Sequence, residues 1–482
     1  MTKEIQTQPI FGKTRHIHFV GIGGIGMSGM AEILLKRGYN ITGSDGSQSE
    51  NTDRLKNMGA TVYLGHAPEN IKGADVVVYT SAVQAHENVE TREALERKIP
   101  VIKRAEMLAE LMRMKFGIGI AGTHGKTTTT TIAGLVGQAG DFDPTIIVGG
   151  RVHSFHETNA VVGDGDIIIV EADEYDRTFL RLNPSLAVIT NIDTDHLDIY
   201  DDIDDIKNSF VEFANKVPFY GAVIVCLDDP IVRSVIPQIK RRTLSYGTTP
   251  QAQLRAIDIE STAMKTTFKV IFEDELLGEI TLASPGIHNV KNALAAIGVG
   301  IELDMKFENI KAGVANYSGV FRRFQVTADA SEVLVVDDYA HHPTEVQATL
   351  KAAREGWEDR RVVAVFQPHL YSRTQELHEE FGLSFFDAEV LVVTDIYPSR
   401  EAPIEGVTGK MVAETAKDYG HRNVHYIEDK KDLPAELKKI VRKGDIVITM
   451  GAGDIYKYGE MFAEALTSGS FKPKAAKEES EK

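Results

Sequence analysis

Residues 116–130 read FGIGIAGTHGKTTTT, an apolar strand that runs into a glycine-rich turn and then into a helix start. Lys126 and Thr127 stand in the order of a phosphate-binding loop, in which the lysine contacts the β- and γ-phosphates and the hydroxyl contacts Mg²⁺. The standard spacing G-x-x-x-x-G-K-T is not met, because Ile120 occupies the place of the first glycine. The shorter pattern G-T-x-G-K-T still lets the backbone approach a phosphate. This stretch is the most specific signal in the chain and predicts an α/β unit that binds nucleotide phosphates.

Acidic side chains and a histidine follow two further apolar strands of this segment. Glu171 and Asp173 end the strand DIIIVEAD, and Asp193, Asp195 and His196 follow the strand LAVIT. Ligands of an open α/β sheet bind beyond the carboxyl ends of its strands, so we expect Glu171 and His196 to converge on the phosphate-binding loop. Mg²⁺ prefers oxygen ligands, which suits Glu171. His196 is a less typical ligand, and a capping or supporting role is the alternative.

A second glycine-rich turn lies near the N-terminus, where Gly21, Gly23 and Gly26 form the pattern G-x-G-x-x-G. It follows the strand candidate HIHFV and precedes a helix candidate, a context in which small residues and a helix N-terminus bind a diphosphate. Asp45 ends the next strand, where ribose hydroxyls can be bound. The loop alone does not distinguish NAD from another diphosphate-bearing nucleotide such as a UDP-sugar, and a tight turn without a ligand is the alternative.

The whole chain has 482 residues, which at roughly 150 residues per domain predicts about three domains. Its net charge of −17 disfavours binding to nucleic acids and to anionic membranes. The single cysteine, Cys226, lies in the apolar run AVIVC, so we expect a buried thiol in a reducing compartment. We find no signal-peptide core and no apolar run of membrane-spanning length, and the expectation is a soluble cytoplasmic protein.

Strand and helix candidates alternate in three successive segments, which predicts three α/β domains with parallel sheets. We expect the first domain at residues 1–112, the second at 113–318 and the third at 319–468. Residues 469–482 are charged and almost free of apolar side chains, and we expect a disordered tail there. Residues 251–283 alternate more strictly than the rest and predict an antiparallel excursion within the second domain.

A set of independent motifs follows one order along the chain: HFVGIGGIGMSGMAEIL, AGTHGKTTTT, VEADEYD, TNIDTDHLD, GIHNVKNALAA, FRRFQ, DDYAHHPTEV and QPHLYSRT. This set resembles the Mur ligase family over about residues 16–460. The resemblance implies a Rossmann-like N-terminal domain for a UDP-sugar, a central P-loop ATPase-type domain, and a Rossmann-like C-terminal domain that closes over both. It implies an enzyme that uses ATP and Mg²⁺ to join L-alanine to the lactyl carboxylate of UDP-N-acetylmuramate in peptidoglycan precursor synthesis.

In that reaction an acyl phosphate and a tetrahedral intermediate form, and ADP and phosphate are released. The alternative within the family is a ligase that attaches a recycled tripeptide to the same sugar nucleotide. Two alternatives come from other classes. An NAD-dependent dehydrogenase would use the first loop but leaves GTHGKTTTT unexplained. A nucleotide sensor without catalysis is disfavoured by the intact set of Lys126, Thr127, Glu171 and His196. The oligomeric state does not follow from the sequence.

The resemblance also assigns site residues, with the asparagines of the H-N-x-x-N stretch placed near the adenine. The residues assigned to ATP are Gly122, Thr123, His124, Gly125, Lys126, Thr127, Thr128, Asn289, Asn292, Arg323 and Asp338. Those assigned to the UDP-sugar are Gly21, Gly23, Gly24, Gly26, Met27, Ser28 and Asp45. Those on the side of the amino acid and the substrate carboxylate are His341, His369 and Arg373. Mg²⁺ would be held by Thr127, Glu171 and His196, and the catalytic set is Lys126, Glu171, His196 and Arg373.

Some positions depart from the pattern of the family. Tyr175 stands where many members have serine, and Ala340 stands where many have glycine. Leu370 stands where many have arginine, so the contacts of that arginine are not carried over. The group that accepts the proton of the incoming amine is not identified by the sequence. The candidates by residue type are His341, His342 and His369.

Overall fold

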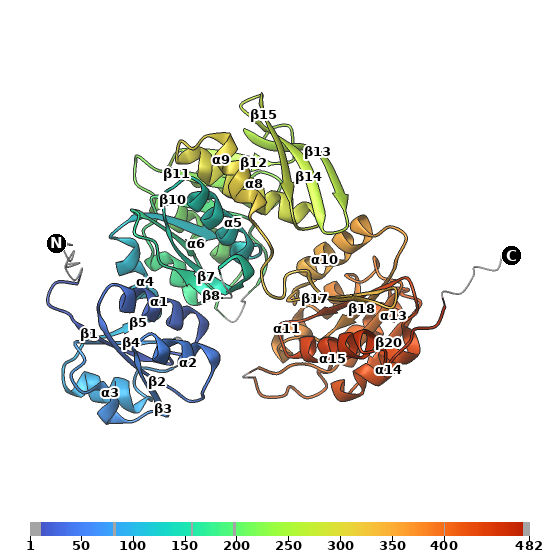
Figure 1. Ribbon diagram of the computed structural model, residues 1–482, viewed down its shortest axis with the longest axis horizontal. Helices are drawn as coiled ribbons and strands as arrows, with labels where there is room; N and C mark the ends of the chain where they lie inside the picture. Colours follow the sequence, from blue (N-terminus) through green and yellow to red (C-terminus); the bar gives the residue numbers. More distant parts are fainter. Residues whose placement is uncertain (1–10, 81–82, 156–157, 196–198, 400, 476–482) are drawn as a thin grey trace. The chain divides into compact units, whose positions relative to one another are not determined.

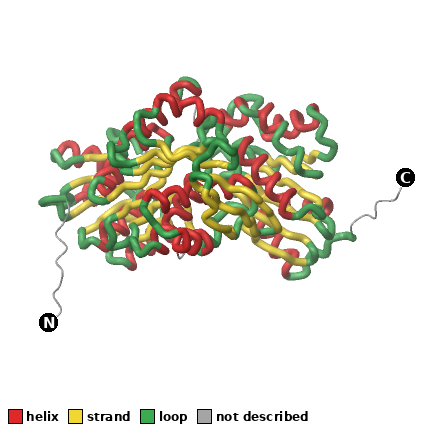
Figure 2. The backbone as a smooth tube through the Cα atoms, turned by 90° about the horizontal axis from the view of Figure 1, so that it is seen from above, coloured by secondary structure: helices red, strands yellow, loops and turns green. Residues whose placement is uncertain are grey.

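The computed structural model describes residues 11–80, 83–155, 158–195, 199–399 and 401–475. These residues form two compact units that contain three β-sheets (Figure 1). Figure 2 shows helices on both sides of the strands. The first unit comprises the residues up to 257 together with 269–280 and 291–317, and the second comprises 258–268, 281–290 and the residues from 318 onward.

The first sheet has the strand order β3-β2-β1-β4-β5, and all neighbouring strands are parallel. This order reverses direction beside β1, so the loop after β1 opens at the point where such sheets bind ligands. The strands are β1 (His16–Val20), β2 (Asn40–Asp45), β3 (Thr61–Leu64), β4 (Val76–Tyr79) and β5 (Val101–Lys103). The helices are α1 (Ile25–Lys36), α2 (Glu50–Asn57), η1 (Pro68–Ile71), α3 (Val89–Glu96) and α4 (Arg104–Met112).

The second sheet has ten strands in the order β15-β14-β13-β12-β11-β10-β6-β9-β7-β8. Its centre is parallel, with β6 between β9 and β10. The strands are β6 (Phe116–Ala121), β7 (Thr145–Val152), β8 (Thr158–Val161), β9 (Ile167–Glu171), β10 (Leu186–Ile189), β11 (Ala222–Cys226), β12 (Thr243–Gly247), β13 (Leu254–Thr262), β14 (Lys265–Phe272) and β15 (Glu275–Leu282). Two residues join β13 to β14 and two join β14 to β15, which is possible only between antiparallel neighbours. The alternation over 251–283 predicts this excursion.

The helical segments of this part of the chain cover the sheet and connect its strands. They are α5 (Lys126–Ala139), η2 (His153–Phe155), η3 (Tyr175–Arg181), α6 (Ile203–Asn215), α7 (Pro230–Val235), η4 (Ile236–Gln238), α8 (Ile287–Glu302) and α9 (Phe307–Ala315). Cys226 is buried at the end of β11, as expected, and burial raises the pKa of its thiol. Among the described residues, no helix combines the length and the apolar character needed to cross a membrane.

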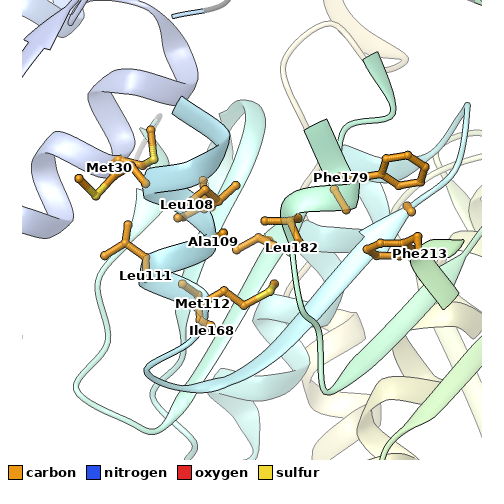
Figure 3. Close-up of a cluster of buried hydrophobic side chains, with 14 of the residues drawn as sticks. Met30, Leu108, Ala109, Leu111, Met112, Ile168, Phe179, Leu182 and Phe213 are labelled. Carbon is orange, nitrogen blue, oxygen red and sulfur yellow. The ribbon is translucent and has the colours of Figure 1, made fainter. Parts of the chain in front are cut away.

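Helix α4 joins the cores under the first two sheets (Figure 3). Its apolar residues Leu108, Leu111 and Met112 recur at helical spacing and are nearly fully buried. In Figure 3 they lie between Met30 of α1 and Ile168 of β9. Because both ends of this contact are buried in one apolar cluster, α4 holds the first two sheets together within the first unit.

The third sheet lies in the second unit and has the order β16-β17-β21-β18-β19-β20. Only β16 and β17 pair in antiparallel fashion, and the other pairs are parallel. The strands are β16 (Gln325–Ala330), β17 (Val333–Asp338), β18 (Arg361–Phe366), β19 (Val390–Thr394), β20 (Val424–Ile427) and β21 (Asp445–Met450). The helices are α10 (Pro343–Gly356), α11 (Tyr371–Glu376), α12 (His378–Gly382), α13 (Gly409–Asp418), η5 (Lys430–Asp432), α14 (Leu433–Ile440) and α15 (Ile455–Thr467).

The expectation of a disordered tail over 469–482 is wrong for its first part. The Phe471 ring lies 5.7 Å from that of Phe462 in α15, and the Lys443 N–H donates to the carbonyl of Lys474. An aromatic side chain and one backbone hydrogen bond therefore hold the start of the tail against α15 and the loop before β21. Residues 476–482 lie outside the described residues.

Candidate nucleotide-binding site

The phosphate-binding loop connects β6 to α5, and two of its glycines are required by its geometry. Gly122 has a φ of +140° and Gly125 a φ of +81°, which side chains other than glycine rarely adopt. A Cβ at Gly122 would collide with the hydroxyl of Thr190, and one at Gly125 with the amide oxygen of Asn292. The loop is therefore packed closely from two sides, and its backbone has no room for a larger residue.

Side chains after β10 hold this loop in place. The Asn191 side chain accepts from the N–H of His124 at 2.8 Å and donates to its carbonyl at 2.9 Å. The Asp193 N–H donates to the hydroxyl of Thr123 at 2.9 Å, and an Asp193 carboxylate oxygen lies 3.2 Å from Nε2 of His124. The sequence pattern placed Asp193 near the loop but missed Asn191, whose only signal is its position directly after an apolar strand.

Lys126 begins α5, and its ammonium group is fully engaged. It donates to the carbonyls of Gly122 and Thr123 at 2.7 and 3.1 Å, and to both carboxylate oxygens of Glu174 at 2.8 and 2.7 Å. An ammonium has three protons, so these four acceptors leave none for a phosphate. Only 3% of the Glu174 side chain is exposed, and burial raises the pKa of this carboxyl to about 7 against the opposing effect of Lys126. Sequence reasoning missed Glu174, which lies among several acidic residues of VEADEYD.

Oxygen ligands for a magnesium ion stand beside this lysine. The Thr127 hydroxyl donates to both carboxylate oxygens of Glu171 at 3.1 and 3.0 Å, and the N–H of Gly149 donates to one of them at 2.6 Å. A hydroxyl and a carboxylate side by side at a phosphate-binding loop are the donor types that Mg²⁺ prefers. The pair therefore fits this ion. His196, the third expected ligand, lies outside the described residues.

Two further residues expected at ATP have different surroundings. The amide oxygen of Asn292 in α8 accepts from the Thr129 hydroxyl at 3.2 Å, so Asn292 joins α8 to the loop helix. Asn289 donates to the Ser284 hydroxyl and to the carbonyl of Pro285, both at 2.8 Å, and so supports the start of α8.

Two hydroxyls of the threonine run in α5 make hydrogen bonds within the helix. The side chain of Thr128 is buried. The hydroxyls of Thr130 and Thr131 donate at 2.8 Å to the carbonyls four residues earlier. Such bonds satisfy buried hydroxyls inside a helix, which makes threonine acceptable at these positions.

The first glycine-rich loop connects β1 to α1. Gly21 has a φ of +80°, and its N–H donates to the carbonyl of Ser44 at 2.8 Å. The N–H of Gly23 donates to a carboxylate oxygen of Asp45 at 2.9 Å. Asp45 thus shapes the loop itself, besides standing where a ribose is expected. Gly24 precedes α1 without a side-chain cap, which leaves the helix N-terminus open for an anion.

Met27 and Ser28, which the resemblance assigns to the UDP-sugar, have buried side chains. Met27 is 1% exposed and belongs to the apolar core, while the Ser28 hydroxyl is buried and donates to the carbonyl of Ile25 at 3.0 Å. Both are buried residues of the first turn of α1. Their N–H groups both bond to the carbonyl of Gly24.

A buried carboxylate under the first sheet was not found from the sequence. Glu90 in α3 is fully buried and accepts from the Ser44 hydroxyl at 2.5 Å and from Asn70 at 2.6 Å. Nitrogen atoms of His18 and His66 lie 3.5 and 3.3 Å from the same carboxylate. Burial opposes ionisation, but the hydrogen bonds from His18, Ser44 and Asn70 outweigh it and lower the pKa of Glu90 to about 2. Its signal in the sequence is weak, because the partners are far apart along the chain.

In the second unit, Arg323 and Asp338 lie in adjacent segments. The Asp338 carboxylate accepts from the N–H groups of Phe324 and Ala340 at 2.7 and 2.8 Å, and burial raises its pKa to about 6. The Arg323 guanidinium lies 3.2 Å from a carboxylate oxygen of Glu345. Ala340 is fully buried beside Asp338, which explains why a small residue stands there.

The residues expected on the amino-acid side also lie in this unit. The rings of His341 and His369 are 5.8 Å apart, and Arg373 is 8% exposed in α11. His342 is buried at the start of α10. Leu370 precedes α11 with a φ of +69°, an uncommon conformation for a side chain of this kind. The structure therefore brings the two histidines together.

Comparisons with known proteins agree with this architecture. Residues 16–116 match the Mur ligase family, catalytic domain; residues 120–300 match the Mur ligase middle domain; and residues 322–453 match the Mur ligase, glutamate ligase domain. The chain is 57% identical to a UDP-N-acetylmuramate–L-alanine ligase of Salinibacter ruber, over 96% of this chain and 97% of that protein.

Two solved structures share the fold. The UDP-N-acetylmuramate-alanine ligase of Thermotoga maritima has a TM-score of 0.78 and 27% identity, over 94% of this chain and 99% of that one. A murein peptide ligase of Psychrobacter arcticus has a TM-score of 0.67 and 22% identity, over 94% and 98%. The prediction of three α/β domains in series is thereby confirmed.

Proposed function

Because the chain belongs to the Mur ligase family, we propose that it joins L-alanine to the lactyl carboxylate of UDP-N-acetylmuramate at the expense of ATP. The protein is a ligase, and its family serves peptidoglycan precursor synthesis. The single observation that carries the proposal is the pair of glycine-rich loops in the first unit, one after β1 and one after β6. One loop suits the diphosphate of a sugar nucleotide, and the other suits the triphosphate that activates its acid.

The chemistry explains why two nucleotides are needed. A carboxylate is a poor acyl donor at neutral pH, so its oxygen first attacks the γ-phosphorus of ATP. The bond from that phosphorus to the bridging oxygen breaks, ADP leaves, and an acyl phosphate forms. The nitrogen of L-alanine then attacks the acyl carbon and gives a tetrahedral intermediate. The bond to the phosphate oxygen breaks, phosphate leaves, and the nitrogen loses a proton.

This chain's residues would mainly position charge in the first step, because phosphoryl transfer depends on neutralising the transferred group. In this proposal Lys126 leaves Glu174 and binds the terminal phosphates, while the N–H groups at the start of α5 bind their oxygens. Thr127 and Glu171 would hold Mg²⁺, with His196 as the further candidate. A bound Mg²⁺ supplies positive charge to the phosphate oxygens.

The remaining assignments divide the work among the domains. We propose that residues 1–112 bind the UDP-sugar, that 113–318 bind ATP, and that 319–468 complete the site for the amino acid. His341, His369 and Arg373 would act on the amino-acid side, and Arg323 and Asp338 would contact the nucleotide. Because the reaction consumes ATP, we propose that it takes place in the cytoplasm.

The proposal is tested by phosphate release from ATP with each substrate omitted in turn. We expect release only when UDP-N-acetylmuramate, L-alanine and Mg²⁺ are all present. Release that does not depend on L-alanine would contradict the assignment. Replacing L-alanine with the tripeptide L-alanyl-γ-D-glutamyl-meso-diaminopimelate tests the alternative ligase, and a faster reaction with the tripeptide would establish it instead.

A further inference from the structure

Arg104 lies directly against the first glycine-rich loop, although it comes from a distant part of the chain. A Cβ placed on Gly26 would lie 2.5 Å from Nη1 and 3.4 Å from Cζ of Arg104. The third glycine of G-x-G-x-x-G therefore leaves space that the guanidinium group fills. Any larger residue at position 26 would push the arginine away from the start of α1.

The surroundings of Arg104 leave its hydrogen-bonding capacity open. The side chain is 29% exposed, and its one ion pair to a described residue joins Nη2 to a carboxylate oxygen of Asp173 at a long 3.8 Å. Within the described part of the chain, its five N–H donors make no hydrogen bond. Across the same stretch, the N–H groups of Ile25 and Gly26 also lack an acceptor. Two helix N–H groups without an acceptor and a guanidinium thus lie close together at the start of α1.

The packing of helix α4 fixes the backbone of Arg104 in this place. Arg104 is the first residue of α4, and the apolar side of this helix, including Leu108 and Leu111, is buried in the core that Figure 3 shows. The start of α1 is fixed as well, because Asn159 of β8 donates to the carbonyl of Ile25. A charged group on such a fixed support can be kept ready for a ligand without a large ordering cost.

We propose that Arg104 binds the diphosphate of the sugar nucleotide, together with the open N–H groups at the start of α1. A guanidinium offers a planar fork that matches two phosphate oxygens, which an ammonium cannot do. Asp173 would give up its long contact when the diphosphate arrives, since a phosphate at hydrogen-bond distance is the stronger partner. This inference rests on the proposed function, because it assigns a residue to the sugar-nucleotide site of that function.

The experiment measures calorimetric binding of UDP, uridine and ADP to the full chain with Mg²⁺. In Arg104→Gln we expect UDP affinity to fall roughly 10- to 100-fold, as for a lost hydrogen bond to a charged group. Uridine and ADP affinities stay as in the unchanged chain. Arg104→Lys keeps the positive charge without the planar fork, so its UDP affinity should lie between those of Arg104→Gln and the unchanged chain. The control is Arg113→Gln at the other end of α4, whose side chain is 60% exposed.

The outcomes separate this inference from the proposed function. Equal loss of uridine and UDP affinity in Arg104→Gln would mean that the arginine only supports the fold and would overturn the inference. A loss of ADP affinity without a loss of UDP affinity would also overturn it, by moving the residue to the second loop. Equal UDP affinity of Arg104→Gln and the unchanged chain would reject the role of Arg104 but would leave the proposed function standing. If the unchanged chain binds no UDP, the proposed function itself fails.

Discussion

Both carboxylate oxygens of Glu174 accept hydrogen bonds from the ammonium of Lys126, at 2.8 and 2.7 Å. The carboxylate thereby occupies the position on the lysine that we assign to a nucleotide phosphate. The pair is buried, with 13% and 3% of the side chains exposed, so neither charge is well solvated without the other. In this account, a nucleotide phosphate must replace the Glu174 carboxylate as the partner of the Lys126 ammonium.

The first prediction concerns this exchange. Glu174→Gln removes the competing charge, so ADP should bind about tenfold more tightly, as for one hydrogen bond to a charged group. The same variant leaves Lys126 with a neutral partner, and the nucleotide-free protein should unfold at a lower temperature. Calorimetry with ADP and a thermal melt measure the two effects. Weaker ADP binding would contradict competition and would mean that Glu174 orients the lysine for the phosphate.

The second prediction concerns Lys126 itself. Lys126→Ala removes the positive charge assigned to the terminal phosphates and should lower the rate of phosphate release about 100-fold or more. Lys207→Ala is the control, because this lysine pairs with Asp204 at the surface end of α6 and should leave the rate unchanged. Full activity of Lys126→Ala would remove this residue from the account.

The third prediction separates backbone strain from crowding at the loop. Gly125 and Gly38 have nearly the same φ, +81° and +82°, but a Cβ on Gly38 meets nothing within 4 Å whereas one on Gly125 collides with Asn292. Gly38→Ala should therefore cost only backbone strain, about 1 kcal/mol of the free energy of unfolding. Gly125→Ala should cost more and should also abolish ADP binding. Equal stability of the two variants, measured by denaturant unfolding, would contradict the crowded loop.

The fourth prediction concerns acid stability and Glu90. The pKa of Glu90 is lowered from 4.5 to about 2 in the folded protein. Between these values the unfolded chain binds more protons than the folded one, so stability contributed by Glu90 is full above pH 4.5 and is lost as the pH falls toward 2. Glu90→Gln should have a flatter decline of melting temperature over this window than the unchanged chain. The exposed Glu69→Gln is the control, and an equal decline in all three proteins would show that Glu90 contributes nothing.

Local patterns predicted the strand–loop–helix units well, because glycine spacing and apolar strands are encoded by adjacent residues. Asn191 and Glu174 could not be singled out in this way. Their roles arise from contacts across parallel strands, and several acidic neighbours of Glu174 look the same in the sequence. Arg104 was missed for a similar reason, because it meets Gly26 only after α4 packs onto α1. Residues so far apart in the sequence are not linked by the short-range periodicity of a helix or a strand.

Two other places show what a sequence pattern leaves out. Met27 and Ser28 were assigned to the UDP-sugar by the resemblance, which does not say that their side chains are buried. The tail was expected to be disordered from its charge, yet its one aromatic residue, Phe471, packs against Phe462 of α15 and its backbone makes hydrogen bonds. The charged composition of the tail therefore did not reveal the packing of Phe471.

The central claim is that the chain binds two nucleotides at once, one at the loop after β1 and one at the loop after β6. Calorimetry on the Mg²⁺-supplied protein tests it, with ADP titrated first and UDP titrated into the ADP-saturated sample. The account predicts one site for each ligand, with UDP affinity unchanged by saturation with ADP. Competition of both nucleotides for a single site would contradict it.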